Sequence, residues 1–246
     1  GCVRILSALS ASLDMQAMTV TGQTLEQALE NTDIPNWPQS IIRSSKQPIY
    51  EEGGLAVLYG NLAPEGAIIK QVAASQHLLS HTGRAVVFEN MADLAARIDT
   101  PDLDVSQDDI LVLRQIGPKG APGMPEAGLI PIPKKLANQG VRDMVRISDG
   151  RMSGTASGTI ILHVAPESAV GGPLSLVRTG DQIQLDVAAR RLSMLVSEQE
   201  LERRKAEQPA ALSTERRGYE KLFYDHVLQA PEGVDFDFLQ AEKYNH

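Results

Sequence analysis

The sequence predicts a mainly β fold of the α+β class, in which about eight strands form a β-barrel with a few flanking helices. Eight short segments are rich in β-branched residues and are separated by Gly, Pro or Asp, as is typical of strands and turns. Their spacing is irregular and no internal repeat is visible, which favours a closed or nearly closed barrel over a propeller or solenoid. The predicted strands cover residues 55–59, 67–70, 84–88, 109–114, 142–148, 158–164, 182–187 and 190–196.

The start of the chain differs from the rest because its apolar residues recur at helical spacing. We expect helical structure over residues 1–30, with a separate short helix at 24–30. Two prolines interrupt residues 31–40, so this stretch predicts a linker or a domain boundary. The predicted parts are residues 1–40, a barrel domain of residues 41–208 with inserted helices, and a C-terminal helix and tail of residues 209–246.

Three more helices are expected within and after the barrel. Residues 90–99 form an amphipathic segment for which Asn90 is a suitable N-cap. Ser197, followed three residues later by Glu200, predicts a capping box at the start of the next helix. The last predicted helix, 214–229, carries an apolar stripe that favours a docking surface over a ligand site. The stripe consists of Tyr219, Leu222, Phe223 and Val227.

The composition of the chain argues against a nucleic-acid-binding protein, a membrane-spanning protein and a protein whose own cysteines hold an iron–sulfur cluster. The 246 residues carry a net charge of −8 and are 42% hydrophobic, which suits a folded core and offers no basic stripe for nucleic acid. No apolar run approaches the roughly 20 residues that span a bilayer, so we expect a cytoplasmic protein with neither membrane nor nucleic acid as a partner. Cys2 is the only cysteine, which excludes an iron–sulfur cluster held by thiolates of this chain. A start at Gly1 indicates a processed end or a piece of a longer protein.

The first segment that is hard to explain as scaffolding is the Gly- and Pro-rich loop 117–128. It contains four glycines and three prolines directly after a predicted strand, a composition that holds backbone against a ligand. Its single acid is Glu126. From the residues alone, Glu126 is either a solvated surface carboxylate or a ligand of a hard cation such as Mg²⁺.

The second such segment, 146–158, crosses between two predicted strands and is crowded with hydroxyls, glycines and the guanidinium of Arg151. These groups could hold an anion or a polyol. Ser153 as a triad nucleophile would need a histidine, but the neighbours of His163 are apolar and favour a buried, hydrogen-bonded side chain. His77 and His81 could share a helix face, and without a third ligand they are best interpreted as an ordinary exposed pair.

Four long motifs together resemble the C-terminal part of the dihydroxy-acid and 6-phosphogluconate dehydratase family. They are EEGGLAVLYGNLAPEGAIIK (51–70), LVLRQIGPKGAPGMPE (111–126), VRDMVRISDGRMSGTASGTIILHVAPESAVGGPL (141–174) and GYEKLFYDHVLQAPEGVDFDFL (218–239). The resemblance implies a swivelling β-barrel preceded by an N-terminal α/β domain, of which residues 1–40 would be the end and linker. It also implies a hydro-lyase that turns a 2,3-dihydroxy acid into a 2-keto-3-deoxy acid.

The same resemblance implies cofactors and site residues. The cofactors are Mg²⁺ and a [2Fe–2S] or [4Fe–4S] cluster, whose cysteines would lie outside this chain. Glu126 is implied as a Mg²⁺ ligand and Ser153 as the base at C2, while His246 would belong to a tail near the active site. The substrate-binding residues that it implies are Arg151, Gly154 and Thr155.

The segment RMSGTASG (151–158) and the long tail resemble the aldonate dehydratases, which act on L-arabinonate or D-xylonate. The hydroxyl of Thr155 suits a polyhydroxylated acid. A branched-chain dihydroxy-acid dehydratase is the alternative within the same chemistry. The alternative from another class is a non-catalytic, mobile swivelling or binding module, with phosphorylation at His163. Expected partners are the N-terminal α/β domain, a small sugar acid, and copies of the chain in a homodimer or dimer of dimers.

Overall fold

The computed structural model describes residues 1–33, 37, 39–126, 130–154, 156–208 and 217–240. The chain divides into two compact units, Gly1–Gly53 and Gly54–His246. In the first unit, α1 (Cys2–Ala8) is followed by a 3₁₀ turn and by α2 (Leu25–Glu30). Thr24 caps α2 through a reciprocal pair of hydrogen bonds with Gln27, which confirms the short helix predicted at 24–30.

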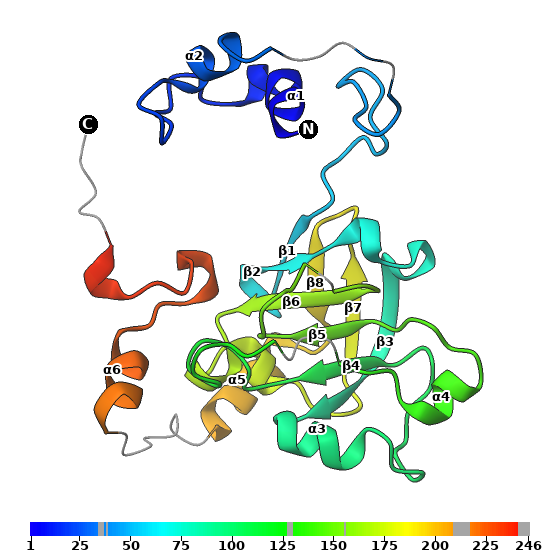
Figure 1. The fold of residues 1–246 in the computed structure, drawn as a ribbon. Coiled ribbons are helices and arrows are strands. Elements are labelled where there is room, and N and C mark those ends of the chain that lie inside the picture. Colours follow the sequence, from blue (N-terminus) through cyan, green and yellow to red (C-terminus); the bar gives the residue numbers. More distant parts are fainter. Residues whose placement is uncertain (34–36, 38, 127–129, 155, 209–216, 241–246) are drawn as a thin grey trace. The chain divides into compact units, whose positions relative to one another are not determined.

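The second unit is built on a closed eight-stranded barrel (Figure 1), as predicted. Each of the eight predicted segments contains one of the observed strands, wholly or in part. Around the barrel the order is β1-β2-β6-β5-β4-β3-β7-β8, with β3, β4, β5 and β6 parallel to one another. The strands are β1 (Ala56–Gly60), β2 (Ala63–Ile69), β3 (Ser80–Phe88), β4 (Ile110–Leu113), β5 (Arg146–Ser148), β6 (Ile160–Ala165), β7 (Gln182–Asp186) and β8 (Arg191–Met194).

Two apolar clusters stabilise this unit, one inside the barrel and one outside β3 and β4. All four residues of β4 are buried because its inward side chains fill the barrel and its outward ones are covered. The covering layer includes α3 (Met91–Arg97) and the short α4 (Lys134–Asn138), which lie beside these strands in Figure 1. The sequence patterns did not predict α4.

The predicted helix caps are only partly confirmed. The Asn90 side chain accepts a hydrogen bond from Asp93 N, at 3.0 Å, and begins α3. Ser197 caps α5 (Glu198–Glu207) by accepting from Glu200 N, at 3.2 Å. The Glu200 carboxylate instead accepts from the guanidinium of Arg204, at 2.7 Å, so the predicted reciprocal half of this box is wrong. The Glu200 carboxylate thus forms an ion pair with Arg204 instead of a hydrogen bond with the backbone N–H of Ser197.

The last helix is shorter than predicted, and its apolar stripe is only partly buried. Of the expected 214–229, residues 214–216 lie outside the described residues, and α6 spans Gly218–His226. Val227 is buried and Phe223 packs edge-on against Phe236, at 5.7 Å between ring centroids. Tyr219 lies one turn before Phe223 on the same face of α6, but it is 90% exposed, so the contacts cover only the C-terminal part of the stripe.

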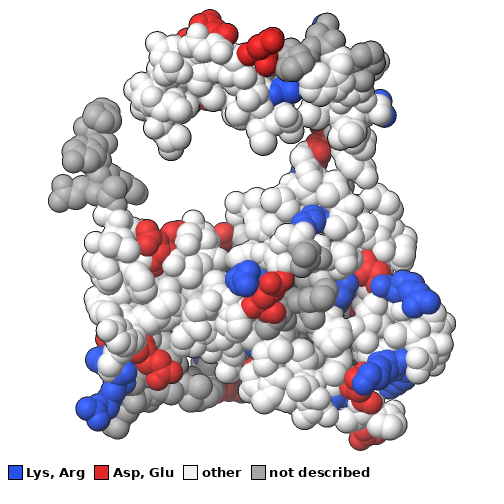
Figure 2. All heavy atoms as spheres, viewed as in Figure 1, with Lys and Arg blue, Asp and Glu red and all other residues white. Residues whose placement is uncertain are grey.

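Charged side chains are spread in small groups over the face seen in Figure 2, and many Lys and Arg residues lie beside Asp or Glu. One such pair joins Lys134 to Asp99, at 2.8 Å. Among the helices of the described residues, none has both the length and the apolar composition to cross a bilayer.

Candidate functional site

The two segments singled out in the sequence start at neighbouring points of the barrel. Residues 114–126 follow β4 and residues 149–159 follow β5, and these strands are parallel neighbours. Because β5 and β6 are also parallel, residues 149–159 must cross back along the barrel before β6 begins. This requirement explains why the segment is a long irregular crossing, here called the Ser153 crossing, rather than a tight turn.

Arg151 joins the Ser153 crossing to the Gly- and Pro-rich loop. Its Nε donates to Met124 O at 2.8 Å, and its Nη2 lies 3.6 Å from Glu126 Oε2. Both side chains of this ion pair remain more than two-fifths exposed. The structure therefore brings Arg151 and Glu126 together and leaves both accessible to a small molecule.

Glu126 fits a magnesium site only as one ligand among several. Within the described residues there is no group of three or more His, Cys, Asp or Glu that could hold a metal ion. Mg²⁺ commonly takes one or two carboxylates and fills the rest of its octahedron with water and substrate, so one exposed carboxylate suits it. An iron–sulfur cluster does not fit, because Cys2, which is exposed, is the only cysteine of the chain.

His163 holds the Ser153 crossing and is not part of a triad. Its ring Nε2 lies 2.8 Å from Met152 N and accepts that hydrogen bond, while the backbone N–H of His163 donates to Gly150 O. Burial, with a smaller effect from the charge of Arg151, lowers the pKa of His163 below 6.5 and keeps the ring neutral. Nε2 is therefore engaged by the backbone, which argues against a phosphohistidine at this atom. The prediction of a hydrogen-bonded His163 is confirmed, although the side chain is half-buried rather than buried.

A buried ion pair fixes the far end of the Ser153 crossing. Asp143 and Arg146 lie 2.8 Å apart with side chains only 9% and 5% exposed. Asp143 also accepts from Thr159 N and from Thr159 Oγ1, the latter at 2.7 Å. Burial acts to raise the pKa of Asp143, but hydrogen bonds from Thr159 and Ser75 and the Arg146 charge outweigh it, so the pKa is lowered.

Gly158 is required where the crossing passes this ion pair. Its φ is +94°, and an added Cβ would lie 2.2 Å from Arg146 Nη2. A side chain at this position would displace the guanidinium, so the glycine has a structural role rather than a role in holding substrate.

Asp149, at the start of the Ser153 crossing, forms hydrogen bonds with Ile116, which follows β4, and with Ser168, which follows β6. This carboxylate is 1% exposed and accepts from Ile116 N at 3.0 Å and from Ser168 N at 2.9 Å. Ser168 Oγ donates to it as well, at 2.5 Å. Burial raises the pKa of Asp149 despite these hydrogen bonds.

Glu167 is a second buried carboxylate, around which the Gly- and Pro-rich loop is folded. It is 1% exposed and accepts from Lys119 N and Gly120 N, each at 2.9 Å. Gln229, from the C-terminal tail, donates to it at 2.8 Å and accepts from Glu167 N. Burial raises the pKa of Glu167. Sequence reasoning missed this residue because its partners lie more than 40 positions away along the chain.

The remaining predicted site residues have different outcomes. Ser153 is half-buried on the crossing, and Gly154 is exposed at the next position. Thr155 and His246 lie outside the described residues. His77 lies in a 3₁₀ turn and His81 on β3, so the idea that they share a helix face is wrong. His81 Nε2 is instead engaged with Asp108 O at 2.8 Å.

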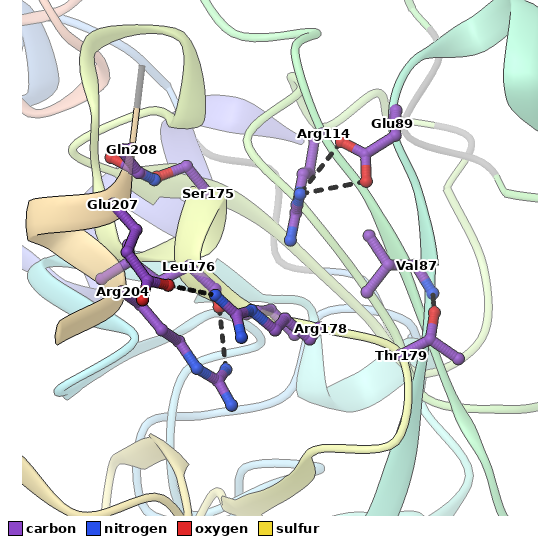
Figure 3. A pocket seen from close by; sticks show the side chains of 11 residues that line it. Val87, Glu89, Arg114, Ser175, Leu176, Arg178, Thr179, Arg204, Glu207 and Gln208 are labelled. Carbon is purple, nitrogen blue, oxygen red and sulfur yellow. Dashed lines mark hydrogen bonds and ion pairs between the residues drawn. The ribbon is translucent and has the colours of Figure 1, made fainter. Parts of the chain in front are cut away.

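A pocket of about 350 Å³ lies elsewhere on the barrel and is lined by three arginines among other residues (Figure 3). Arg114 donates to both oxygens of Glu89, and Arg178 lies 3.2 Å from a Glu207 oxygen. Arg204, the third, is paired with Asp181 and Glu200. Because each guanidinium already has a carboxylate partner, the pocket offers little net charge to an anion, and we do not take it as the functional site.

A comparison with known protein families identifies the class to which this barrel belongs. The pattern of the dihydroxy-acid/6-phosphogluconate dehydratase C-terminal domain matches residues 40–234. The chain belongs to this family.

Individual relatives include enzymes named for both substrate types. The chain is 50% identical over 244 residues to 6-deoxy-6-sulfo-D-gluconate dehydratase of Pseudomonas putida, covering 98% of this chain and 42% of that protein. It is 47% identical to L-arabinonate dehydratase of Rhizobium leguminosarum bv. trifolii (95% and 40% covered). It is 42% identical to dihydroxy-acid dehydratase of Methanothrix thermoacetophila (84% and 37% covered). The chain thus spans about two-fifths of the length of these relatives.

Proposed function

We propose that this chain is the C-terminal swivelling barrel of a hydro-lyase that dehydrates an aldonate to a 2-keto-3-deoxy acid. The observation that carries the proposal is the contact of Arg151 with Glu126 and Met124, which supports a single site built from both Gly-rich segments. The choice of an aldonate is supported by relatives at 47% and 50% identity that are named for L-arabinonate and 6-deoxy-6-sulfo-D-gluconate.

In this proposal Ser153 is the base that removes the proton from C2 of the substrate. The electron pair of the C2–H bond forms the C2–C3 double bond as the C3–O bond breaks. The departing hydroxide takes up the proton that Ser153 removed and leaves as water, and the enol tautomerises to the 2-keto acid. A serine hydroxyl ionises too weakly in water to act as a base, so it needs nearby positive charge. Arg151, two residues away, supplies one such charge.

Glu126 would hold Mg²⁺, which supplies Lewis-acid polarisation of the substrate carboxylate when bound. Arg151, Gly154 and Thr155 would bind the substrate's carboxylate and hydroxyls, because a guanidinium, a backbone N–H and a hydroxyl are the groups that recognise them. His246 is proposed as part of a tail near the site. The iron–sulfur cluster that the resemblance implies would need cysteines from outside this chain.

The partner that completes this site would be an N-terminal α/β domain. We also propose that the enzyme is a cytoplasmic homodimer or dimer of dimers. The pairing of Gln229 with Glu167 supports a tail that is held close to the Gly- and Pro-rich loop.

The test is a Ser153→Ala substitution in the protein that contains both this chain and the N-terminal domain. Formation of 2-keto-3-deoxy acid from L-arabinonate or D-xylonate should fall by about 10²- to 10⁴-fold, the range for loss of a general base. Ser157→Ala is the matched control, because Ser157 is an exposed hydroxyl of the same crossing, and it should keep activity within about threefold. Full activity of Ser153→Ala would remove Ser153 from the mechanism.

A branched-chain dihydroxy-acid dehydratase is the second candidate, supported by the relative at 42% identity. Comparing turnover of L-arabinonate with that of 2,3-dihydroxyisovalerate separates the two. The proposal predicts faster turnover of the aldonate, and a preference for dihydroxyisovalerate would reverse the assignment.

A further inference from the structure

Lys70 reaches into the Ser153 crossing from another strand. It directly follows β2, whose residue Ile69 pairs with Ile161 of the antiparallel β6. This register places Lys70 beside the start of β6, where the crossing rejoins the barrel. Its Nζ lies 2.9 Å from Gly154 O, 3.2 Å from Ala156 O and 3.5 Å from Ser153 O.

We propose that Lys70 is a positioning residue, which holds the backbone around Ser153 in the conformation needed for proton abstraction. An ammonium group has three N–H donors, and three carbonyls of a single turn surround this one. The inference rests on the proposed role of Ser153 and adds to it a residue that lies 83 positions earlier in the chain.

The crossing needs such support because its sequence gives it little rigidity of its own. Residues 151–154 have no helical or strand structure, and Gly154 is exposed with open space where a Cβ would lie. Glycine has wide backbone freedom, so a base carried beside it is poorly fixed unless neighbouring groups restrain it. His163 restrains the Met152 amide, and Lys70 restrains the carbonyls that follow.

Lys70 also brings positive charge to this turn. Its ammonium nitrogen lies 3.5 Å from the backbone carbonyl oxygen of Ser153. A cation close to a hydroxyl favours the ionised form of that hydroxyl, which is the form that accepts a proton. The hydrogen bonds of Lys70 and its positive charge would therefore both favour Ser153 as a base.

The test uses Lys70→Met and Lys70→Arg in the protein that contains the N-terminal domain. Methionine keeps the unbranched chain and removes the donors, so kcat should fall about 10- to 100-fold while KM changes less than about threefold. Arginine keeps charge and donors in a planar group, and should restore part of the lost kcat. Lys205→Met, on an exposed face of α5, is the matched control and should keep kcat.

Hydrogen exchange gives a readout that does not depend on turnover. Amides of residues 152–158 should exchange faster in Lys70→Met, while those of β3 and β4 stay unchanged. In a Ser153→Ala background, Lys70→Met should add almost no further loss of kcat, because both act through one group.

Three results would overturn the inference. Unchanged exchange in Lys70→Met would show that the lysine does not hold the crossing. Faster exchange with unchanged kcat would show that fixing the backbone of the crossing does not affect the rate of dehydration. If Ser153→Ala lowers kcat and Lys70→Met lowers it further by its full factor in that background, the two residues act separately. If Ser153→Ala itself is fully active, the proposed function fails, and the exchange result still decides whether Lys70 holds the turn.

Discussion

Single buried side chains, rather than surface charges, hold the candidate site together. Glu167 accepts backbone N–H groups from the Gly- and Pro-rich loop, and Asp149 accepts one from Ile116, directly before that loop. Asp143 does the same for the end of the Ser153 crossing. A carboxylate is suited to this task because it can accept several hydrogen bonds at once. Loops without regular structure are thereby given fixed backbones.

Removing the charge of Asp143 should destabilise the chain strongly. Asp143→Asn leaves the buried guanidinium of Arg146 without its ion-pair partner, which costs about 3–5 kcal/mol in comparable cases. The free energy of unfolding in urea measures this loss. The exposed Asp102→Asn is the control, and equal stability of the two variants would contradict the account.

This ion pair also gives the stability of the chain a defined pH dependence. Folding lowers the pKa of Asp143 below its ordinary 3.8. Its contribution is therefore fully present above pH 3.8 and is lost as pH falls through the folded-state pKa. Asp143→Asn should lack this part of the acid-induced loss.

His163 predicts a second pH effect, at higher pH. Its folded-state pKa lies below 6.5, so its contribution to stability is complete above that pH and is lost as the pH falls toward the folded-state value. His163→Gln should cost about 1 kcal/mol at pH 7.5, from the weakened bond to Met152 N. The difference in unfolding free energy between wild type and variant should shrink toward pH 5. A constant difference would mean that folding does not lower the pKa of His163.

At the scale of elements, the strands were the predictable part. Their β-branched composition and turn residues are local signals, and all eight predicted segments contain observed strands. The short α4 has no such signal, because it spans five residues after Pro133. Its formation depends on packing of Leu136 against the outer cluster.

The candidate site was predictable only in part. Glycine, proline and hydroxyl content marked both segments, and the motif resemblance singled out Glu126 and Ser153. Lys70, Glu167 and the buried bridging role of Asp149 were missed, because their contacts depend on strand register and on residues far away in sequence. Composition cannot reveal which carbonyls surround an ammonium group.

The Gly- and Pro-rich loop makes its own prediction. A Cβ at Gly117 would lie 2.5 Å from Glu167 Oε2. Gly117→Ala should therefore displace this buried carboxylate and destabilise the chain by about 1–3 kcal/mol, as overpacking commonly does. Gly53→Ala, where a Cβ meets nothing within 4 Å, is the control in the same thermal or urea unfolding experiment. No difference between the two would show that the loop does not depend on Glu167.

At the scale of the whole molecule, the barrel supplies a rigid frame that presents two adjacent segments. Closure of the sheet leaves no free edge, and apolar side chains fill its interior. Among the described residues of the site, Glu126 is the accessible carboxylate, and neither of its two segments contains a cysteine. A metal-dependent dehydration would therefore need groups from a second domain. The account therefore treats this barrel as half of an active site.

The most direct test of this claim compares the 246-residue chain alone with the same chain joined to the N-terminal α/β domain. Each is supplied with L-arabinonate and Mg²⁺, and 2-keto-3-deoxy acid is measured over time. The account predicts product from the joined protein and none from the isolated chain. Dehydration by the isolated chain, or none by the joined protein with any aldonate or with 2,3-dihydroxyisovalerate, would contradict it.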